Sequence, residues 1–153
     1  MKDDTVLMGA GVIYKRPKGK EPQWFLVKTS DESEWELPKT LVRRGESSVR
    51  SVIRLTQEQA MMRTKILEEV GRASGAGRVN GRAVNQKYLY YLMHCKDIGE
   101  ILGFHDHKWA EYKTGMKLLT LKRDQNMLKD AKQLLKTIDV KREKIEIIEK
   151  TEE

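Results

Sequence analysis

Cysteine and long apolar runs are both scarce in this sequence. The one cysteine, Cys95, excludes an internal disulfide bond, which suits a reducing compartment. No segment approaches the roughly 20 apolar residues that a membrane-spanning helix needs. The first residues, Met1-Lys2-Asp3-Asp4, carry acids where a signal peptide carries positive charge before an apolar stretch. We therefore expect a soluble, cytoplasmic protein.

Positive charge, in contrast, is in excess. The chain has 153 residues with 30 Lys and Arg against 23 Asp and Glu, giving a net charge of +7 and a pI near 9.4. Such a field attracts polyanions, and nucleotides, nucleic acids and anionic membranes all qualify. A well-solvated surface explains the same excess. Hydrophobic residues make up 39% of the chain, enough for the packed core of one domain.

The hydrophobic pattern predicts an α/β (α+β) fold. Residues 5–14 are apolar with small residues inside, which indicates a buried strand with a close backbone neighbour. A helix is predicted from Ser47 to Met61 by apolar residues three and four apart. Residues 65–74 fit a continued helix or a new strand, and glycines at 71, 75, 77 and 81 favour turns. Further strands are expected at 23–28, 35–39 and 86–93, and further helices at 113–120 and 123–138.

The last residues, 139–153, alternate Lys, Arg and Glu with isolated isoleucines. This pattern is typical of a solvated or frayed extension. We therefore divide the chain into one domain, 1–138, and a charged C-terminal extension, 139–153.

The segment from Trp35 to Met62 resembles the Nudix box. That motif runs Gly, five residues, Glu, seven residues, Arg-Glu, an apolar residue, any residue, Glu-Glu, any residue, Gly and an apolar residue. Thr40, Glu46 and Arg54 stand at this spacing without a gap, after a family-like Leu-Pro-Lys. The Thr-Gln-Glu at 56–58 looks like the diadenosine-tetraphosphate (Ap4A) hydrolase branch. The resemblance implies an α/β/α sandwich with a mixed sheet.

A second register places the end of the motif at Glu68-Glu69, followed by Val70 and Gly71. It requires about ten inserted helical residues, which at 100° each rotate the carboxylates by about −80°. We therefore favour the ungapped register, in which residues 65–74 form the strand that follows the motif.

The resemblance implies metal-dependent chemistry. Carboxylates on one helix face hold Mg²⁺ or Mn²⁺, which neutralises a pyrophosphate and activates water. The corresponding positions here are Leu55, Glu58 and Gln59, so only Glu58 keeps its charge. The two glycines of the motif are Thr40 and Met61, which is expected to alter the loop and the helix end. Glu46 and Arg54, which brace loop against helix in the family, both remain as structural residues.

Asp106 resembles an acidic residue that lies later in the family, six residues before an aromatic position held here by Tyr112. The resemblance makes Glu58 and Asp106 the catalytic and metal-binding candidates. His105 and His107 flank Asp106 and invite a zinc site, but no third His or Cys stands at ligand spacing. A polar loop is the favoured interpretation.

The sequence gives a less specific signal for the residues that would bind the ligand. We assign phosphate binding to Lys39, Arg43 and Arg44, and base stacking to Tyr88 and Tyr90. Other basic and aromatic residues are open to the same functions or to a solvated hairpin and the core, namely Arg78, Arg82 and Tyr91.

Two functions follow from these assignments. The first is a Nudix-type nucleoside (di)polyphosphate hydrolase, or a descendant with impaired metal-dependent catalysis, using Mg²⁺ or Mn²⁺ if active. The alternative is a non-catalytic Nudix-fold module that binds nucleotide or RNA. Either has a nucleotide partner and no membrane partner.

Overall fold

The computed structural model describes residues 5–152, without the side chains of Val79 and Glu152. Met1–Asp4, on which the signal-peptide argument depended, and Glu153 lie outside the described residues. The elements are β1 (Thr5–Lys15), β2 (Gln23–Lys28), β3 (Lys39–Leu41), α1 (Ser48–Ala60), β4 (Met62–Val79), β5 (Arg82–Ile98), β6 (Asp106–Glu111), α2 (Tyr112–Leu118) and α3 (Lys122–Glu152).

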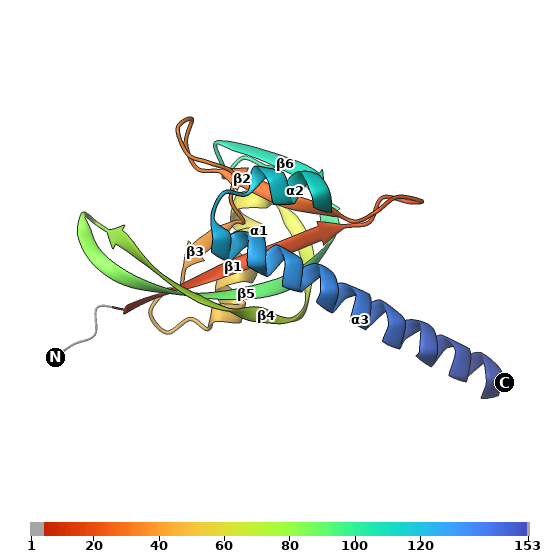
Figure 1. Ribbon diagram of the computed structural model, residues 1–153. Helices are drawn as coiled ribbons and strands as arrows, with labels where there is room; N and C mark the ends of the chain where they lie inside the picture. Colours follow the sequence, from red (N-terminus) through yellow and green to blue (C-terminus); the bar gives the residue numbers. More distant parts are fainter. Residues whose placement is uncertain (1–4, 153) are drawn as a thin grey trace.

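The strands form one mixed sheet in the order β4-β5-β1-β2-β6, with β3 paired to β1 (Figure 1). β1 and β5 are parallel, from Thr5 opposite Asn85 to Tyr14 opposite His94. All other pairs are antiparallel. β1 is the middle strand of this order, and its residues from Gly9 to Tyr14 are buried.

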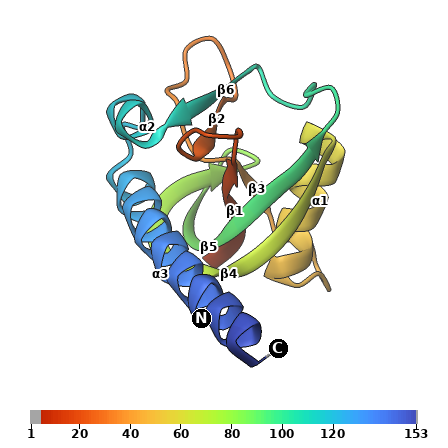
Figure 2. The same ribbon diagram turned by 90° about the vertical axis from the view of Figure 1, so that its right-hand side faces the viewer.

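Helices cover both faces of the sheet, as Figure 2 shows: α1 lies on one side, and α2 and α3 lie on the other. Two hydrophobic clusters fill the spaces between. Met127, Leu128 and Ala131 of α3 pack on the first face, while Val52 and Ala60 of α1 pack on the second. The expected α/β/α sandwich with a mixed sheet is confirmed.

Helix α1 begins and ends where the sequence predicts. The Ser47 side chain accepts a hydrogen bond from the Arg50 N–H (3.1 Å), which caps the first turn. At the other end Met61 has φ of 47°, the left-handed conformation that glycine adopts without cost. The helix end therefore keeps a glycine-type geometry although the residue is methionine. Gly9 of β1 gives α1 its close approach, since a Cβ there would collide with the Ser51 hydroxyl.

Residues 62–79 form strand β4, so the register that treats Glu68 and Glu69 as helical is wrong. The expectation of turns at Gly71, Gly75 and Gly77 is also wrong, because all three lie inside this strand. The turn is formed by Asn80 and Gly81, with φ of 53° and 76°, between the paired Val79 and Arg82. Asn-Gly is the preferred pair for such a two-residue hairpin.

The C-terminal extension is helical. α3 runs through residue 138 without a break and continues to Glu152, so fraying of this extension is not observed. Its isoleucines at 145, 147 and 148 are exposed, in agreement with a solvated segment. No helix among the described residues combines the length and apolarity that crossing a membrane requires.

Candidate functional site

The loop between β3 and α1 is braced by Glu46 and Arg54. The Arg54 Nε lies 2.9 Å from Glu46 Oε2, and its Nη2 donates to Glu46 Oε1 (3.0 Å) and to the Leu41 carbonyl (2.8 Å). The Arg43 N–H also donates to Glu46 (3.0 Å). The hydrogen bonds from Arg54 and Arg43 lower the pKa of Glu46 from 4.5 to about 2. The loop is thereby tied to the helix that follows it.

The three helix positions assigned to metal binding have very different surroundings. Leu55 is 1% exposed, Glu58 is exposed, and Gln59 is half-buried. The Gly103 N–H donates to the Gln59 carbonyl (2.8 Å), and a Cβ at Gly103 would collide with Gln59. Gln59 is thus covered by the loop that precedes β6.

Asp106 opens β6 as an exposed residue, and its carboxylate accepts the His107 N–H (2.8 Å). The flanking histidines make separate contacts: the His105 ring bonds Asp31 (2.6 Å), while the His107 ring lies 6.0 Å from that of Phe25. Within residues 5–152, no three His, Cys, Asp or Glu side chains come together in a group that could hold a metal ion.

These donors do not fit the metal site that the resemblance implies. Leucine has no ligand atom, and glutamine offers one neutral oxygen where a carboxylate is required. Glu58 supplies the one charged ligand of the three positions. No reaction step through a metal can be built from these residues.

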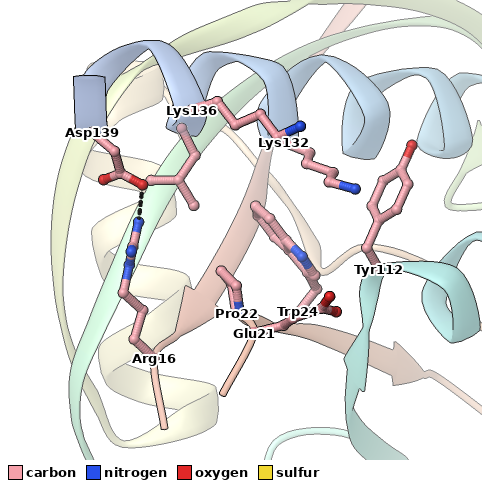
Figure 3. A pocket seen from close by; sticks show the side chains of 9 residues that line it. Arg16, Glu21, Pro22, Trp24, Tyr112, Lys132, Lys136 and Asp139 are labelled. Carbon is pink, nitrogen blue, oxygen red and sulfur yellow. Dashed lines mark hydrogen bonds and ion pairs between the residues drawn. The ribbon is translucent and has the colours of Figure 1, made fainter. Parts of the chain in front are cut away.

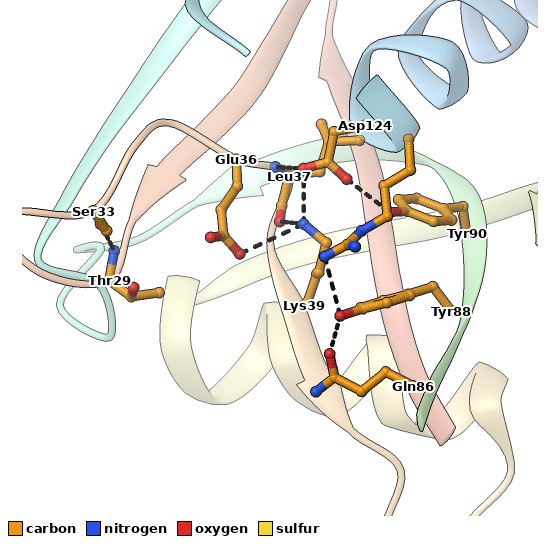
Figure 4. Close-up of polar contacts among 10 residues, drawn as sticks. Thr29, Ser33, Glu36, Leu37, Lys39, Gln86, Tyr88, Tyr90 and Asp124 are labelled. Carbon is orange, nitrogen blue, oxygen red and sulfur yellow. Dashed lines mark hydrogen bonds and ion pairs between the residues drawn. The ribbon is translucent and has the colours of Figure 1, made fainter. Parts of the chain in front are cut away.

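The position of Lys39 in the structure does not suit its predicted role in phosphate binding. Its ammonium group lies 2.8 Å from the fully buried Asp124 carboxylate and also donates to the Leu37 carbonyl (2.9 Å) (Figure 4). The Lys39 side chain is only 7% exposed. Its assignment to phosphate binding is therefore corrected: Lys39 balances a buried acid.

The two tyrosines assigned to base stacking are buried as well. Tyr90 is 0% exposed, and its hydroxyl donates to Asp124 (2.7 Å). Tyr88 is 3% exposed, and its hydroxyl donates to Gln86. Tyr91, on the opposite face, shares a hydrogen bond with Ser48 (2.6 Å). Burial raises the pKa of both Tyr88 and Tyr90. Neither ring can stack on a base in this structure, so that prediction is wrong.

Arg123 and Asp124 are site residues that the sequence reasoning missed. The Arg123 guanidinium lies 4.3 Å from the centre of the Tyr88 ring and donates to the Tyr88 hydroxyl (3.1 Å). Its Nε is buried and has no hydrogen-bond partner among the described residues. A Cβ at Gly75 would lie 2.6 Å from Arg123 Nη1, so a larger residue there would require the guanidinium to shift. A buried N–H without a partner is costly unless an acceptor reaches it.

The burial of Asp124 could have been predicted from a helical pattern in the sequence. Met127, Leu128, Ala131 and Leu135 mark the buried face of α3, and Asp124 precedes them at the same spacing. An acid on an apolar face demands a buried partner. Which partner it takes is decided by the fold, because Lys39 stands 85 residues away.

The remaining predicted arginines are all exposed. Arg43 and Arg44 lie in the braced loop, and Arg78 and Arg82 flank the tip of the β4–β5 hairpin. Arg78 also donates to the Gly81 carbonyl (3.1 Å), which supports the turn. Arg43 and Arg44 therefore differ in exposure from the buried Lys39, with which they were grouped.

Comparison with solved structures identifies the fold. The chain resembles an Ap4A hydrolase from C. elegans, solved as a binary complex, with 23% identity and a TM-score of 0.68 over 86% of this chain and 98% of that one. A Nudix hydrolase from M. smegmatis, RenU, has 13% identity and a TM-score of 0.68 over 90% of each chain. The NUDIX domain of Shewanella oneidensis NrtR, solved with ADP ribose, has 16% identity and a TM-score of 0.63 over 86% of this chain and 88% of that one.

No family model matches the sequence, and no curated protein does. The likeness in structure establishes that this chain has the Nudix fold.

Proposed function

We propose that this chain descends from Nudix nucleoside (di)polyphosphate hydrolases and binds a nucleotide, with impaired metal-dependent catalysis. One observation carries the proposal: of the three box positions for carboxylates, Leu55 is buried and uncharged, and Gln59 is neutral and covered by Gly103. The brace of Glu46 and Arg54, which needs no metal, is fully formed.

The physical reason lies in how Mg²⁺ is held. Mg²⁺ keeps its waters unless several oxygens and a substrate phosphate compete for them. Each carboxylate lost weakens the hold on the ion and the field that makes a bound water acidic. Glu58 alone, exposed to water, supplies little of either.

The ligand class is proposed from charge and from the relatives. The similar proteins include an Ap4A hydrolase and a domain solved with ADP ribose, both of which point to a ligand with a pyrophosphate. Arg43 and Arg44 are exposed beside the box helix and would meet such an anion with forked contacts.

A second candidate, a nucleotide- or RNA-binding module without any turnover, is favoured by Arg123. Its Nε is buried without a partner among the described residues, and Gly75, on which Arg123 packs, lines an open depression together with Gln86 and Lys87. A ligand acceptor there would be held without any metal. The two candidates differ in one outcome, since the descendant keeps slow hydrolysis and the module has none.

The test restores the missing carboxylates. Calorimetry of the unmodified protein with Mn²⁺ is expected to give weak or no binding, and the variant Leu55→Glu with Gln59→Glu is expected to bind Mn²⁺. Because position 55 is buried, the new carboxylate should destabilise the metal-free variant, and Mn²⁺ should raise its Tm.

Gln59→Glu alone, at a half-buried position, serves if the double variant does not fold. Glu143→Gln, on the exposed part of α3, is the control. Tight Mn²⁺ binding by the unmodified protein would overturn the proposal. Unchanged Mn²⁺ affinity in both variants would show that the helix no longer directs these positions at a metal, and it would contradict descent through box erosion alone.

A further inference from the structure

A basic pocket lies at the end of the sheet where β1 and β5 finish. We define it by four cations, Lys15, Arg16, Lys20 and Lys96, which line an open depression of about 710 Å³ together with His94. No Asp or Glu is among the described residues that line it. Like charges gather at one place only against their mutual repulsion, which a bound anion relieves.

Nearby acids do not compensate these cations fully. Asp139 pairs with Arg16 at 2.6 Å, and Asp97 pairs with Arg63, an arginine outside the pocket, also at 2.6 Å. Lys15, Lys20 and Lys96 therefore set the charge of the basic pocket. The contrast is a neighbouring cavity of about 330 Å³ beside α3, where Glu21 and Asp139 lie among the cations (Figure 3).

The surroundings of His94 show the same excess of positive charge. Its ring stacks on Tyr14, with the ring centres 4.9 Å apart. The pKa of His94 is lowered first by burial and then by four surrounding cations, Arg16, Lys96, Arg142 and Lys65. Cations from β4, β5, α3 and the loop that follows β1 thus converge on this end of the sheet.

We propose that the basic pocket binds single-stranded nucleic acid through its phosphodiester backbone. The pocket is open and lined by several separate cations, which suits a chain of phosphates held by counterion release better than one enclosed small ligand. It is also concave, so a strand can enter it while a flat bilayer surface cannot.

This site is separate from the Arg123 region of the second candidate function. His94 stands six residues beyond Tyr88 on β5, about 20 Å at roughly 3.3 Å per residue. The basic pocket and the Arg123 region can therefore be tested independently.

The test compares two triple variants with the same loss of charge. Lys15→Gln, Lys20→Gln and Lys96→Gln neutralise the pocket, while Lys141→Gln, Lys144→Gln and Lys150→Gln neutralise the exposed part of α3. Fluorescence anisotropy with labelled single-stranded RNA and DNA of mixed sequence is measured across salt concentrations. The pocket variant should lose roughly tenfold in affinity and about 2 in the salt slope, while the α3 variant should change by less than about twofold.

Equal losses in the two variants would mean that net charge alone binds the strand, and would overturn the proposal. Binding to anionic phospholipid vesicles without binding to either oligonucleotide would overturn it as well. RNA and DNA bound alike support backbone recognition, and a preference for RNA adds a contact to the 2′-hydroxyl.

NMR of His94 in the unmodified protein gives a second readout. Oligonucleotide binding should shift the His94 ring resonances and raise its pKa, because phosphate charge offsets the surrounding cations. If the triple variant does not fold, Lys20→Gln alone, in an exposed loop, is expected to weaken binding and reduce this shift. Shifts confined to other parts of the molecule would contradict the site.

Discussion

Two regions of the segment from Trp35 to Met62 differ sharply. The first region is the loop between β3 and α1 with the residues that fix its ends. The charged residues that fix these ends form ion pairs: Lys39 pairs with Asp124, and Arg54 pairs with Glu46. In the second, at the following positions of α1, Leu55 and Gln59 stand where the resemblance expects carboxylates. The first region positions a loop and a helix, whereas the second would perform chemistry.

Under the proposed function, the structural and chemical parts of one motif are separable. Ion pairs and caps lower the free energy of the folded state whether or not a reaction takes place. A cluster of carboxylates without a bound metal raises the free energy of the folded state, because the carboxylates repel one another. Replacing a carboxylate by leucine therefore helps folding while it removes a ligand.

The largest effect is expected from Asp124→Ala in the first region. It leaves the buried Lys39 ammonium with only the longer contact to Glu36 (3.5 Å) as counter-charge, and it removes the partner of the Tyr90 hydroxyl. The free energy of unfolding should fall by about 3–5 kcal/mol, as for other broken buried pairs. Urea denaturation measures this free energy of unfolding. The control, Asp139→Ala, removes the exposed partner of Arg16 and should cost no more than about 1 kcal/mol. Equal costs would refute the buried pair.

In the second region Leu55→Ala should cost about 2–4 kcal/mol, because a fully buried leucine leaves a cavity. Glu58→Gln, on the exposed side of the same helix, should change stability by less than about 0.5 kcal/mol. Urea denaturation of both variants sharpens the comparison: a small cost for Leu55→Ala would mean that this position still lies open to a site.

A smaller effect is expected from the pH dependence of the brace. The folded pKa of Glu46 is depressed to about 2 from 4.5, so its contribution to stability is present above pH 4.5 and is lost as the pH falls toward 2. Unmodified protein should be more stable than Glu46→Gln at neutral pH, and the difference should shrink across that window. Denaturation at several pH values checks this, with Glu143→Gln as the control. A constant difference would exclude Glu46 ionisation as its source.

Local patterns were enough to predict most elements of the fold. The stripe from Val49 to Ala60 predicted α1, and the ungapped register predicted a strand at 65–74. The glycines of β4 led to a wrong prediction of turns, because Gly71 and Gly75 lie inside the strand, where they pack closely against Met127 and Arg123.

The site was harder to predict because its contacts are distant in sequence. Glu46 and Arg54 are eight residues apart, and the family spacing pairs them directly. Lys39 and Asp124 are 85 residues apart, and only the packing of α3 on the sheet brings them together. Alternation on a strand likewise shows that Tyr88 and Tyr90 share a face, but which layer covers that face is decided by the whole chain.

We propose that helix α1 no longer supports metal-dependent hydrolysis at ordinary rates. A product assay of the unmodified protein on a diadenosine polyphosphate, with and without Mg²⁺, tests it most directly. We predict turnover far below roughly 1 s⁻¹, the lower end of ordinary enzyme rates, and little gain from Mg²⁺. Rapid Mg²⁺-dependent cleavage at or above that rate would contradict the claim.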